Sequence, residues 1–477
     1  MQNTVLSNLE AIPKLEKAGV IFSDDKKTLL KCANKEITQI IIPDNVTTIG
    51  KEAFWDCIMN LTSVVIPNSV TKIEEKAFAY CFSLTNVVIP NSVTKIEKKA
   101  FYNCCSLTNV VIPDSVTKIE EEAFAECHML TSIVIPNSVT KIEEKAFYHC
   151  SRLTNVVIPN SVTEIGEAAF SQVQQIISNN EKFKVDAKGG LIDTNLQTLL
   201  YVPQKTKEYI IPHNVTKIGI ETFALCSNLT NVVIPNSVTE IGEEAFSGCS
   251  SLTNVVIPNS VTKIGSGAFS SCDSLASVVI PDSVTEIGKS AFEGCYSLAN
   301  IVIPKSVTKI GSGAFSKVQQ IISNNEKFKV DAKGGLIDTN LQTLLYVPPM
   351  TTKYVIPDNV TKIGIKAFAS CFFLTKVVIP DSVTEIREEA FWRCHMLTKV
   401  VIPDSVTEIR EEAFAECSSL TSVIISKRIT EIGEKAFCCC SSLASIDLPD
   451  SMIKIGRKAF WRCPCEEELR KKYPHLF

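Results

Sequence analysis

Residues 84–106 read LTNVVIPNSVTKIEKKAFYNCCS, and this pattern of 23 residues recurs along most of the 477-residue chain. A proline marks its register, because Pro90, Pro113 and Pro136 follow one another at constant intervals. A fixed period of about 20–29 residues is typical of a solenoid in which each repeat forms one coil. The proline slot is occupied by Pro43, Pro67, Pro90, Pro113, Pro136, Pro159, Pro212, Pro235, Pro258, Pro281, Pro304, Pro357, Pro380, Pro403, Ser426 and Pro449.

The first part of each coil is predicted to be a short strand. Leu84, Val87 and Ile89 have the spacing L-x-x-L-x-L of leucine-rich repeats, in which these side chains point into the coil. Pro90 ends the strand, because it has no N–H group to donate to a neighbouring strand. Sixteen such coils, with two further strands at 173–178 and 318–323, predict about 18 parallel strands.

The rest of the coil returns the chain to the next strand. Val93 and Ile96 are expected to point inward from a second extended segment. Residues 97–101 are predicted to form one helical or 3-10 turn that places Phe101 in the core. The predicted fold class is an α/β repeat solenoid, a right-handed leucine-rich-repeat superhelix. Its parallel sheet lies on the concave face, with the helical turns opposite and β-hairpins inserted.

Two segments break the period, since Pro159 to Pro212 and Pro304 to Pro357 are each 53 residues apart. Residues 171–203 and 316–348 are identical except at Gln172 and Lys317. Each contains two short apolar runs around Thr-Asn, which predicts a β-hairpin, and residues 19–31 resemble a degenerate copy. The expected organisation is an N-terminal cap (1–42), repeat blocks at 43–170, 212–315 and 357–463, irregular hairpin repeats at 171–211 and 316–356, and a C-terminal cap (464–477).

Composition limits the possible partners. The chain has 48 Lys+Arg against 52 Asp+Glu and no basic stripe with aromatic residues, so nucleic acid is not an expected partner. No apolar run approaches the roughly 18 residues that span a bilayer. Glu10, Lys14 and Glu16 stand where a signal peptide needs an apolar core. We expect a monomer that requires no cofactor.

Nineteen cysteines could suggest a disulfide framework, but their spacing argues for packing. One cysteine per coil, three residues after the phenylalanine, indicates a column of small buried side chains with free thiols. Disulfides between coils and a file of metal ligands are the alternatives. The column contains Cys57, Cys81, Cys104, Cys127, Cys150, Cys226, Cys249, Cys272, Cys295, Cys371, Cys394, Cys417, Cys440 and Cys463, whereas Cys32, Cys105, Cys438 and Cys465 lie outside it and are expected to be reactive.

The outward positions of the strands are the candidate binding residues. A file of valines lies two residues before each proline, and a file of Asn or Ser, changing to Lys, lies four before it. The valines either serve packing within the sheet or form an exposed apolar stripe that binds a partner. The lysines are either solvated, or they mark where the surface that contacts a ligand changes character. The candidates are Val233, Val256, Val279, Val302, Asn231, Asn254, Asn300, Lys353, Lys376 and Lys399.

The chain resembles the BspA-like leucine-rich repeats, also called the TpLRR class. The resemblance covers about residues 19–463 and is carried by L-T-x-V-V-I-P-[ND]-S-V-T-x-I-G-x-x-A-F-x-x-C and by the hairpin G-L-I-D-x-x-x-x-T-L-L-Y-V-P. It implies a non-catalytic protein, commonly secreted or on the surface of bacteria or protozoan parasites, that adheres to host proteins and cells or mediates coaggregation. The chain differs from secreted members because no signal peptide is recognisable.

No catalytic or metal-binding motif accompanies the repeats. The five histidines, His128, His149, His213, His395 and His475, form no H-E-x-x-H pattern, and no cysteine pair has zinc-finger spacing. We therefore predict no enzyme activity and no metal site. The primary hypothesis is a protein- or glycan-binding surface adhesin. The alternative is a cytoplasmic scaffold, or an effector delivered without a signal peptide, that uses the same repeat surface.

Overall fold

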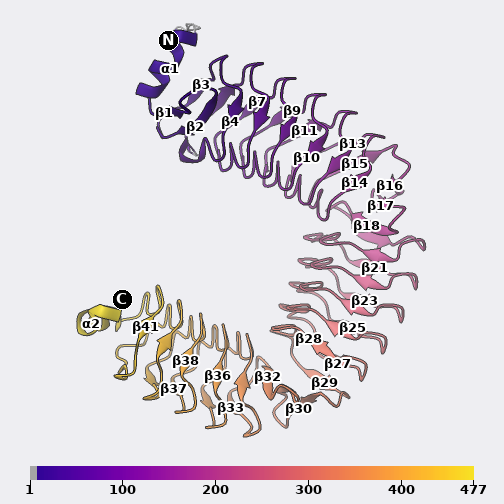
Figure 1. The fold of residues 1–477 in the computed structure, drawn as a ribbon. Coiled ribbons are helices and arrows are strands. Elements are labelled where there is room, and N and C mark those ends of the chain that lie inside the picture. Colours follow the sequence, from indigo (N-terminus) through magenta and orange to yellow (C-terminus); the bar gives the residue numbers. More distant parts are fainter. Residues whose placement is uncertain (1–7, 58, 477) are drawn as a thin grey trace. The chain divides into compact units, whose positions relative to one another are not determined.

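The computed structural model describes residues 8–57 and 59–476 and divides into two compact units. Unit 1 comprises Met1–Thr206 and Asn214–Cys226, and unit 2 comprises Lys207–His213 and Ser227–Phe477. Within each unit the chain forms a solenoid, as the repeat predicts (Figure 1). Most coils contribute one three-residue strand and one two-residue strand. We call the resulting parallel stacks the long-strand ladder and the short-strand ladder.

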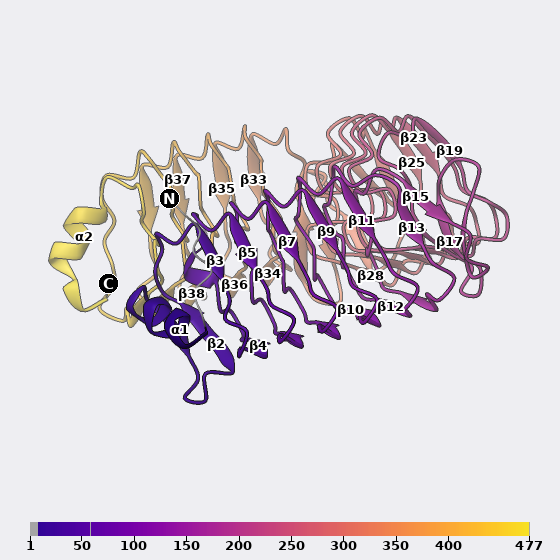
Figure 2. The same cartoon turned by 90° about the horizontal axis from the view of Figure 1, so that it is seen from above.

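Unit 1 begins with helix α1 (Asn8–Lys17) and the antiparallel pair β1 (Val20–Phe22) and β2 (Thr28–Cys32). Figure 2 shows its first long strands side by side. The long strands are β3 (Gln39–Ile41), β5 (Ser63–Val65), β7 (Asn86–Val88), β9 (Asn109–Val111), β11 (Ser132–Val134), β13 (Val156–Ile158) and β15 (Ile176–Ser178). The short strands are β4 (Thr48–Ile49), β6 (Lys72–Ile73), β8 (Lys95–Ile96), β10 (Lys118–Ile119), β12 (Lys141–Ile142), β14 (Glu164–Ile165) and β20 (Lys217–Ile218).

Unit 2 repeats this plan and ends in helix α2 (Glu466–Lys472) and the 3-10 helix η2 (Pro474–Leu476). Its long strands are β19 (Glu208–Ile210), β21 (Asn231–Val233), β23 (Asn254–Val256), β25 (Ser277–Val279), β27 (Ile301–Ile303), β29 (Ile321–Ser323), β33 (Lys353–Val355), β35 (Lys376–Val378), β37 (Lys399–Val401) and β39 (Ser422–Ile424). Its short strands are β22 (Glu240–Ile241), β24 (Lys263–Ile264), β26 (Glu286–Ile287), β28 (Lys309–Ile310), β34 (Lys362–Ile363), β36 (Glu385–Ile386), β38 (Glu408–Ile409), β40 (Glu431–Ile432) and β41 (Lys454–Ile455).

The described part of the chain forms 17 long strands instead of the predicted 18. The predicted strands in the irregular repeats exist, since β15 pairs in parallel with β13 and β29 with β27. The missing one is at 445–447, where Asp447 replaces the usual valine and lowers the strand propensity. Ile446 and Leu448 are nevertheless buried, so the last coil keeps the inward pattern without the ladder hydrogen bonds.

The predicted helical turn is wrong at the residues for which it was predicted. Among the described residues, the stretch around the core phenylalanine is helical only at η1 (Trp55–Cys57), a 3-10 helix that begins after Phe54. Elsewhere it is a pair of turns around the core phenylalanine, which we call the turn ridge. Residues two before and two after the phenylalanine have positive φ, as at Lys99 (58°) and Asn103 (57°). Charged side chains are as compatible with an exposed helical turn as with these left-handed turns, which is why the sequence pattern predicts the wrong conformation here.

The left-handed residues let the turn ridge bond to the next coil. In the coil of Phe78, the N–H groups of Lys76, Phe78 and Tyr80 donate to the following coil at 3.0, 2.8 and 2.8 Å. A helical turn directs its N–H groups along its own axis and could not form these bonds. The ridge is therefore a third set of backbone hydrogen bonds between coils, alongside the two ladders.

Two columns fill the core beneath the ridge. The phenylalanine rings of successive coils stack, with centroids 5.1 Å apart for Phe246 and Phe269. The column cysteines are buried, as predicted, and all nineteen cysteines are free. The column thiols of Cys104, Cys127 and Cys150 each donate to the phenylalanine carbonyl of the preceding coil, for example Cys104 Sγ to Phe78 O at 3.2 Å. Cysteine thus packs and satisfies a buried carbonyl at the same position.

The inserted segments form the predicted hairpins and one additional strand each. In unit 1, β17 (Leu191–Asp193) pairs antiparallel with β18 (Thr198–Tyr201) and with the unpredicted β16 (Phe183–Val185). Strand β18 then pairs in parallel with β20 and so enters the short-strand ladder. Unit 2 repeats this with β30 (Phe328–Val330), β31 (Leu336–Asp338), β32 (Thr343–Tyr346) and β34. The alternation of apolar and charged residues in Phe-Lys-Val could have predicted the extra strand.

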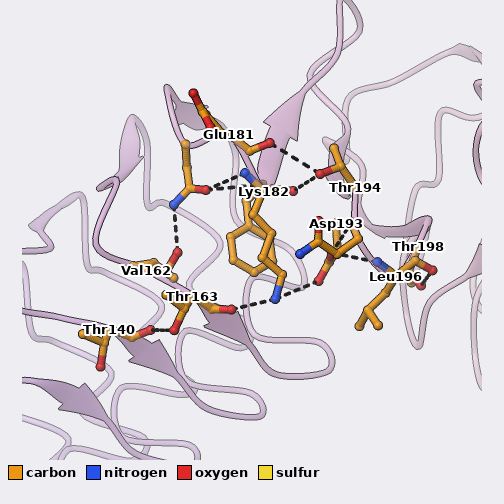
Figure 3. Close-up of polar contacts among 12 residues, drawn as sticks. Thr140, Val162, Thr163, Glu181, Lys182, Asp193, Thr194, Leu196 and Thr198 are labelled. Carbon is orange, nitrogen blue, oxygen red and sulfur yellow. Dashed lines mark hydrogen bonds and ion pairs between the residues drawn. The ribbon is translucent and has the colours of Figure 1, made fainter.

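Polar side chains attach each hairpin to the coil before it, through Lys182 in unit 1 and Lys327 in unit 2. In unit 1 the Lys182 ammonium donates to Thr163 O at 2.7 Å and lies 3.7 Å from the buried Asp193 carboxylate (Figure 3). The other Asp193 oxygen accepts from the N–H groups of Asn195 and Leu196, which closes the hairpin turn. These partners explain how a carboxylate with almost no solvent exposure is tolerated.

Candidate functional site

The valine file of the long-strand ladder is exposed along both units. Each central residue of a strand such as β23 points into the core, and both flanking residues point outward. Val256 and Val279 are 72% and 71% exposed and pair directly in the register of β23 and β25. The structure therefore contains the exposed apolar stripe on which the interaction hypothesis depends. Its members in unit 2 are Ile210, Val233, Val256, Val279, Val302, Ile322, Val355, Val378, Val401 and Ile424.

The asparagine candidates border this stripe. Asn231 and Asn254 begin β21 and β23, and Asn300 lies one residue before β27; all three are exposed. Among the described residues no hydrogen bond engages their side-chain amides. Each amide offers two donors and an acceptor to a ligand.

The lysine candidates form a file of like charges. Lys353, Lys376 and Lys399 are exposed and directly opposite one another in β33, β35 and β37. None of the three forms an ion pair with another described residue. Like charges placed directly opposite one another destabilise a sheet, so this arrangement lowers stability unless an anionic partner is present.

A row of threonines stiffens the same face in unit 1. The hydroxyl of Thr108 donates to Thr85 O at 3.2 Å, and that of Thr131 to Thr108 O at 3.1 Å. Because each hydroxyl is bonded to the preceding coil, the residues beside the stripe are held at a regular spacing. Such a preorganised surface loses little side-chain entropy when a partner binds.

One depression on this face was not predicted. It has a volume of about 580 Å³ and lies between β11 and β13, where the two strands do not pair. Asn155 adopts a φ of 53° just before β13, so this strand begins one residue later than its neighbours. Val134, Val157, Asn155 and Asn160 line the depression. Asn155 is the only sequence signal for the depression, because asparagine adopts the left-handed conformation readily. Asparagine is also the consensus residue at that position, so the signal is not specific.

The turn ridge presents a different surface, because its charges pair with those of neighbouring coils. Lys98 lies 2.7 Å from Glu121, and Lys435 lies 2.7 Å from Glu412. His128 and His149 both contact Glu126, at 3.2 and 3.1 Å, and burial lowers the pKa of His149. Within residues 8–57 and 59–476, no group of His, Cys, Asp or Glu side chains is arranged to hold a metal ion.

The thiols of the column lie in an environment that suppresses their chemistry. Burial raises the pKa of Cys150 and of Cys226 to about 12, so both remain protonated at neutral pH. The expectation for cysteines outside the column is partly wrong. Cys32 and Cys465 are buried, because they pack under the two ends of the repeat array, and Cys438 is buried as well. Cys105 and Cys439 are the two half-buried cysteines.

No helix among the described residues has the length and apolarity needed to cross a bilayer.

No curated protein sequence shows significant similarity to the chain. Solved structures do: a leucine rich cell surface protein from Faecalibacterium prausnitzii A2-165 is 34% identical, with a TM-score of 0.52, over 70% of this chain and 86% of that one. The pneumococcal vaccine antigen PcpA is 18% identical, with a TM-score of 0.54, over 76% of this chain and 99% of that one, and shows the fold alone.

The family described as "BspA type Leucine rich repeat region (6 copies)" matches residues 30–104, 48–177, 197–322 and 348–466, which is most of the chain. The matches contain the leucine strand, the proline and the Ala-Phe core of the repeat. They leave out residues 178–196 and 323–347, which lie in the two irregular repeats. Families of this type are repeat scaffolds that bind other molecules, and the chain belongs to the BspA-type leucine-rich repeat family.

Proposed function

We propose that the chain is a non-catalytic interaction scaffold of the adhesin type, which binds a protein or glycan through its long-strand ladder. The observation that carries this proposal is the exposed valine file, interrupted by no charged residue from β19 to β29. A contiguous apolar stripe bordered by unbonded amides is typical of an interaction surface. A partner that reads it contacts several coils at once, because each coil contributes only a small patch.

The lysine file adds an electrostatic element to the proposed surface. A partner that extends from β27 toward β37 passes from Asn300 to Lys353, Lys376 and Lys399. Acidic groups of that partner would relieve the repulsion between the three ammonium groups. The lysines then increase the association rate and make binding weaker at high ionic strength.

One comparison supports a role outside the cell. The Faecalibacterium relative is described as a cell surface protein, and its 34% identity makes a shared location a reasonable proposal for this chain. The family resemblance favours a host protein or glycan as the ligand. Extracellular-matrix proteins and host glycans are therefore the first probes.

The test compares the ladder with the ridge. The intact chain is applied to a panel of matrix proteins and a glycan array, and binding is quantified by biolayer interferometry. Val256→Glu combined with Val279→Glu places two charges in the stripe and should abolish binding. Glu243→Lys combined with Glu244→Lys changes two charges on the ridge and should leave binding unchanged. Lysine is already present at the ridge position of Glu244 in other coils, for example Lys99.

Circular dichroism and urea unfolding must first show that both double variants are folded. A folded ladder variant that still binds, together with a ridge variant that does not, would assign the site to the ridge. The third variant, Lys376→Glu, tests the electrostatic element alone. It should weaken binding and reduce its salt dependence, without affecting a ligand that binds only the valine stripe.

One observation favours a second candidate function. Nineteen free cysteines are uncommon in secreted proteins and normal in reducing compartments. An intracellular scaffold that uses the same ladder would satisfy this. Protease treatment of intact cells distinguishes the two, because a surface protein is cleaved and an intracellular one is protected.

A further inference from the structure

The turn ridge of unit 2 is interrupted where the second hairpin is inserted. At an ordinary step the ridge N–H groups donate to the next coil, as Phe292 N does to Ala314 O at 2.7 Å. At the interruption the N–H groups of Gly313, Phe315 and Lys317 have no acceptor among the described residues. Gly313 and Lys317 have φ angles of 64° and 73°. Alternating left- and right-handed residues direct such N–H groups to one side and create an anion-binding concavity.

Two buried hydroxyl groups lie at the same interruption. Ser316 is 4% exposed and belongs to the last coil before it, and Ser370 is 1% exposed and belongs to the first coil after it. Neither hydroxyl has a hydrogen-bond partner. Only four buried side-chain polar atoms in the described residues lack one, and two of them are here. Buried hydroxyls are nearly always bonded, so these two are available to a polar group that enters from solution.

Two lysine side chains extend across the interruption. Lys317 Nζ lies 5.5 Å from the ring centroid of Tyr296 and 5.7 Å from that of Trp392, which belong to coils on opposite sides of the gap. Lys366 Nζ lies 2.9 Å from Glu293 and 3.6 Å from Glu389. The two carboxylates therefore compensate Lys366. The charge of Lys317 is held by aromatic rings, and no described carboxylate forms an ion pair with it.

The corresponding interruption in unit 1 shows what fits beside this serine. Ser171 is the counterpart of Ser316, and its hydroxyl donates to the Glu221 carboxylate at 3.1 Å. Glu221 is the counterpart of Lys366, and Gln172 is the counterpart of Lys317. Unit 1 thus has a carboxylate bonded to the serine, whereas unit 2 has Lys366 in place of Glu221 and Lys317 in place of Gln172. The backbone frame of unit 1 therefore accommodates a carboxylate beside its serine.

We propose that this interruption, which we call the ridge notch (Gly313, Phe315–Lys317, Lys366 and Ser370), binds a small oxyanion. The anion accepts hydrogen bonds from the three N–H groups and from the Ser316 and Ser370 hydroxyls. Lys317 supplies a positive charge that forms no ion pair with a described residue, and the Lys366 side chain moves aside as the anion enters. A carboxylate, sulfate and phosphate share the required chemistry, and burial of the hydroxyls favours a small free anion.

The test is isothermal titration calorimetry of the full chain with sodium phosphate, sodium sulfate and sodium acetate at constant ionic strength. We expect one saturable site for at least one of the three, and the preferred anion identifies the geometry. Lys317→Gln introduces the residue found in the other copy and should weaken that binding by about tenfold or more. Ser316→Ala and Ser370→Ala should each weaken it as well.

The matched control is Gln172→Lys, the reverse exchange in unit 1, which should create no second site because Glu221 already occupies that position. The absence of saturable binding for all three anions would overturn the proposal. Equal affinity in the wild type and in Lys317→Gln would do the same. A high-resolution crystal structure grown in the preferred anion should show density bonded to Ser316, and density for water alone would contradict the assignment.

Discussion

The long-strand ladder and the turn ridge are built from the same repeat, yet their outward side chains behave in opposite ways. On the ladder, Val256 and Val279 are exposed, and no charged residue interrupts the file around them. On the ridge, charges of adjacent coils pair, as Lys98 and Glu121 do at 2.7 Å. A surface whose polar groups are satisfied within the chain offers a partner little, whereas the ladder keeps its contacts available.

For stability the ridge matters more than the ladder surface, because the ridge covers the larger core residues. We expect Phe269→Ala to lower the free energy of unfolding by about 3–5 kcal/mol, since it removes one ring from a close stack. Val279→Ala on the ladder should change it by about 0.5 kcal/mol or less, because the side chain is exposed. Urea unfolding measures both. Equal effects would show that the two sides do not differ in packing.

The left-handed turns provide the second test of the ridge. Ser290 has a φ of 54°, and glycine stands at the same position in the neighbouring coils, at Gly267 and Gly313. Ser290→Val should destabilise the protein by about 1–2 kcal/mol, because a β-branched residue is strained there. Ser290→Gly should be neutral or stabilising. If Ser290→Gly instead costs about 1 kcal/mol, the turn behaves as the helical one that the sequence pattern suggests.

The cysteine column makes the stability sensitive to alkaline pH. Burial raises the pKa of Cys150 and Cys295 from 9.0 to about 12, so the unfolded chain loses these protons first as the pH rises. The stabilisation is complete below about pH 9 and is lost progressively between about pH 9 and 12. Urea midpoints across this range should therefore fall. Cys150→Ala should reduce the slope by about one proton, and an unchanged slope would contradict the burial of this thiol.

The smallest effect should come from the ion pairs that distinguish the ridge surface. Lys98→Gln removes the ion pair with Glu121, and the side chains of both residues are more than a third exposed. The loss should be about 0.2–1 kcal/mol and should disappear at high ionic strength. A salt-independent loss above this range would mean that the pair is coupled to the backbone bonds of the ridge.

Several features of the coil could be predicted because they depend on local spacing. Leu84, Val87 and Ile89 are buried, and the column cysteines are buried with them, since a period of 23 places each at the same point of every coil. The strands at 176–178 and 321–323 follow from the same reasoning. The exposed position of the candidate valines and lysines could be predicted too, although their role in binding remains a proposal.

Other features depend on contacts between coils and could not be predicted. The charged residues before Phe101 are compatible with a helical turn, and only the hydrogen bonds to the next coil select the left-handed conformation of Lys99. The depression beside Asn155 arises because β13 pairs with β15 and not with β11. The consensus asparagine has the same identity in coils where this does not happen.

The amino-acid sequence by itself determined the repeat, the inward residues, the inserted hairpins and the family, because each depends on residues within one coil length. The tertiary structure alone decided how the turns are built, where the ladder opens and which polar groups stay unbonded. Ser171 and Ser316 stand in nearly identical segments, but the coil beyond the hairpin presents Glu221 in one copy and Lys366 in the other. The Ser171 hydroxyl is bonded to a residue 50 positions away, which packing brings near and local pattern does not.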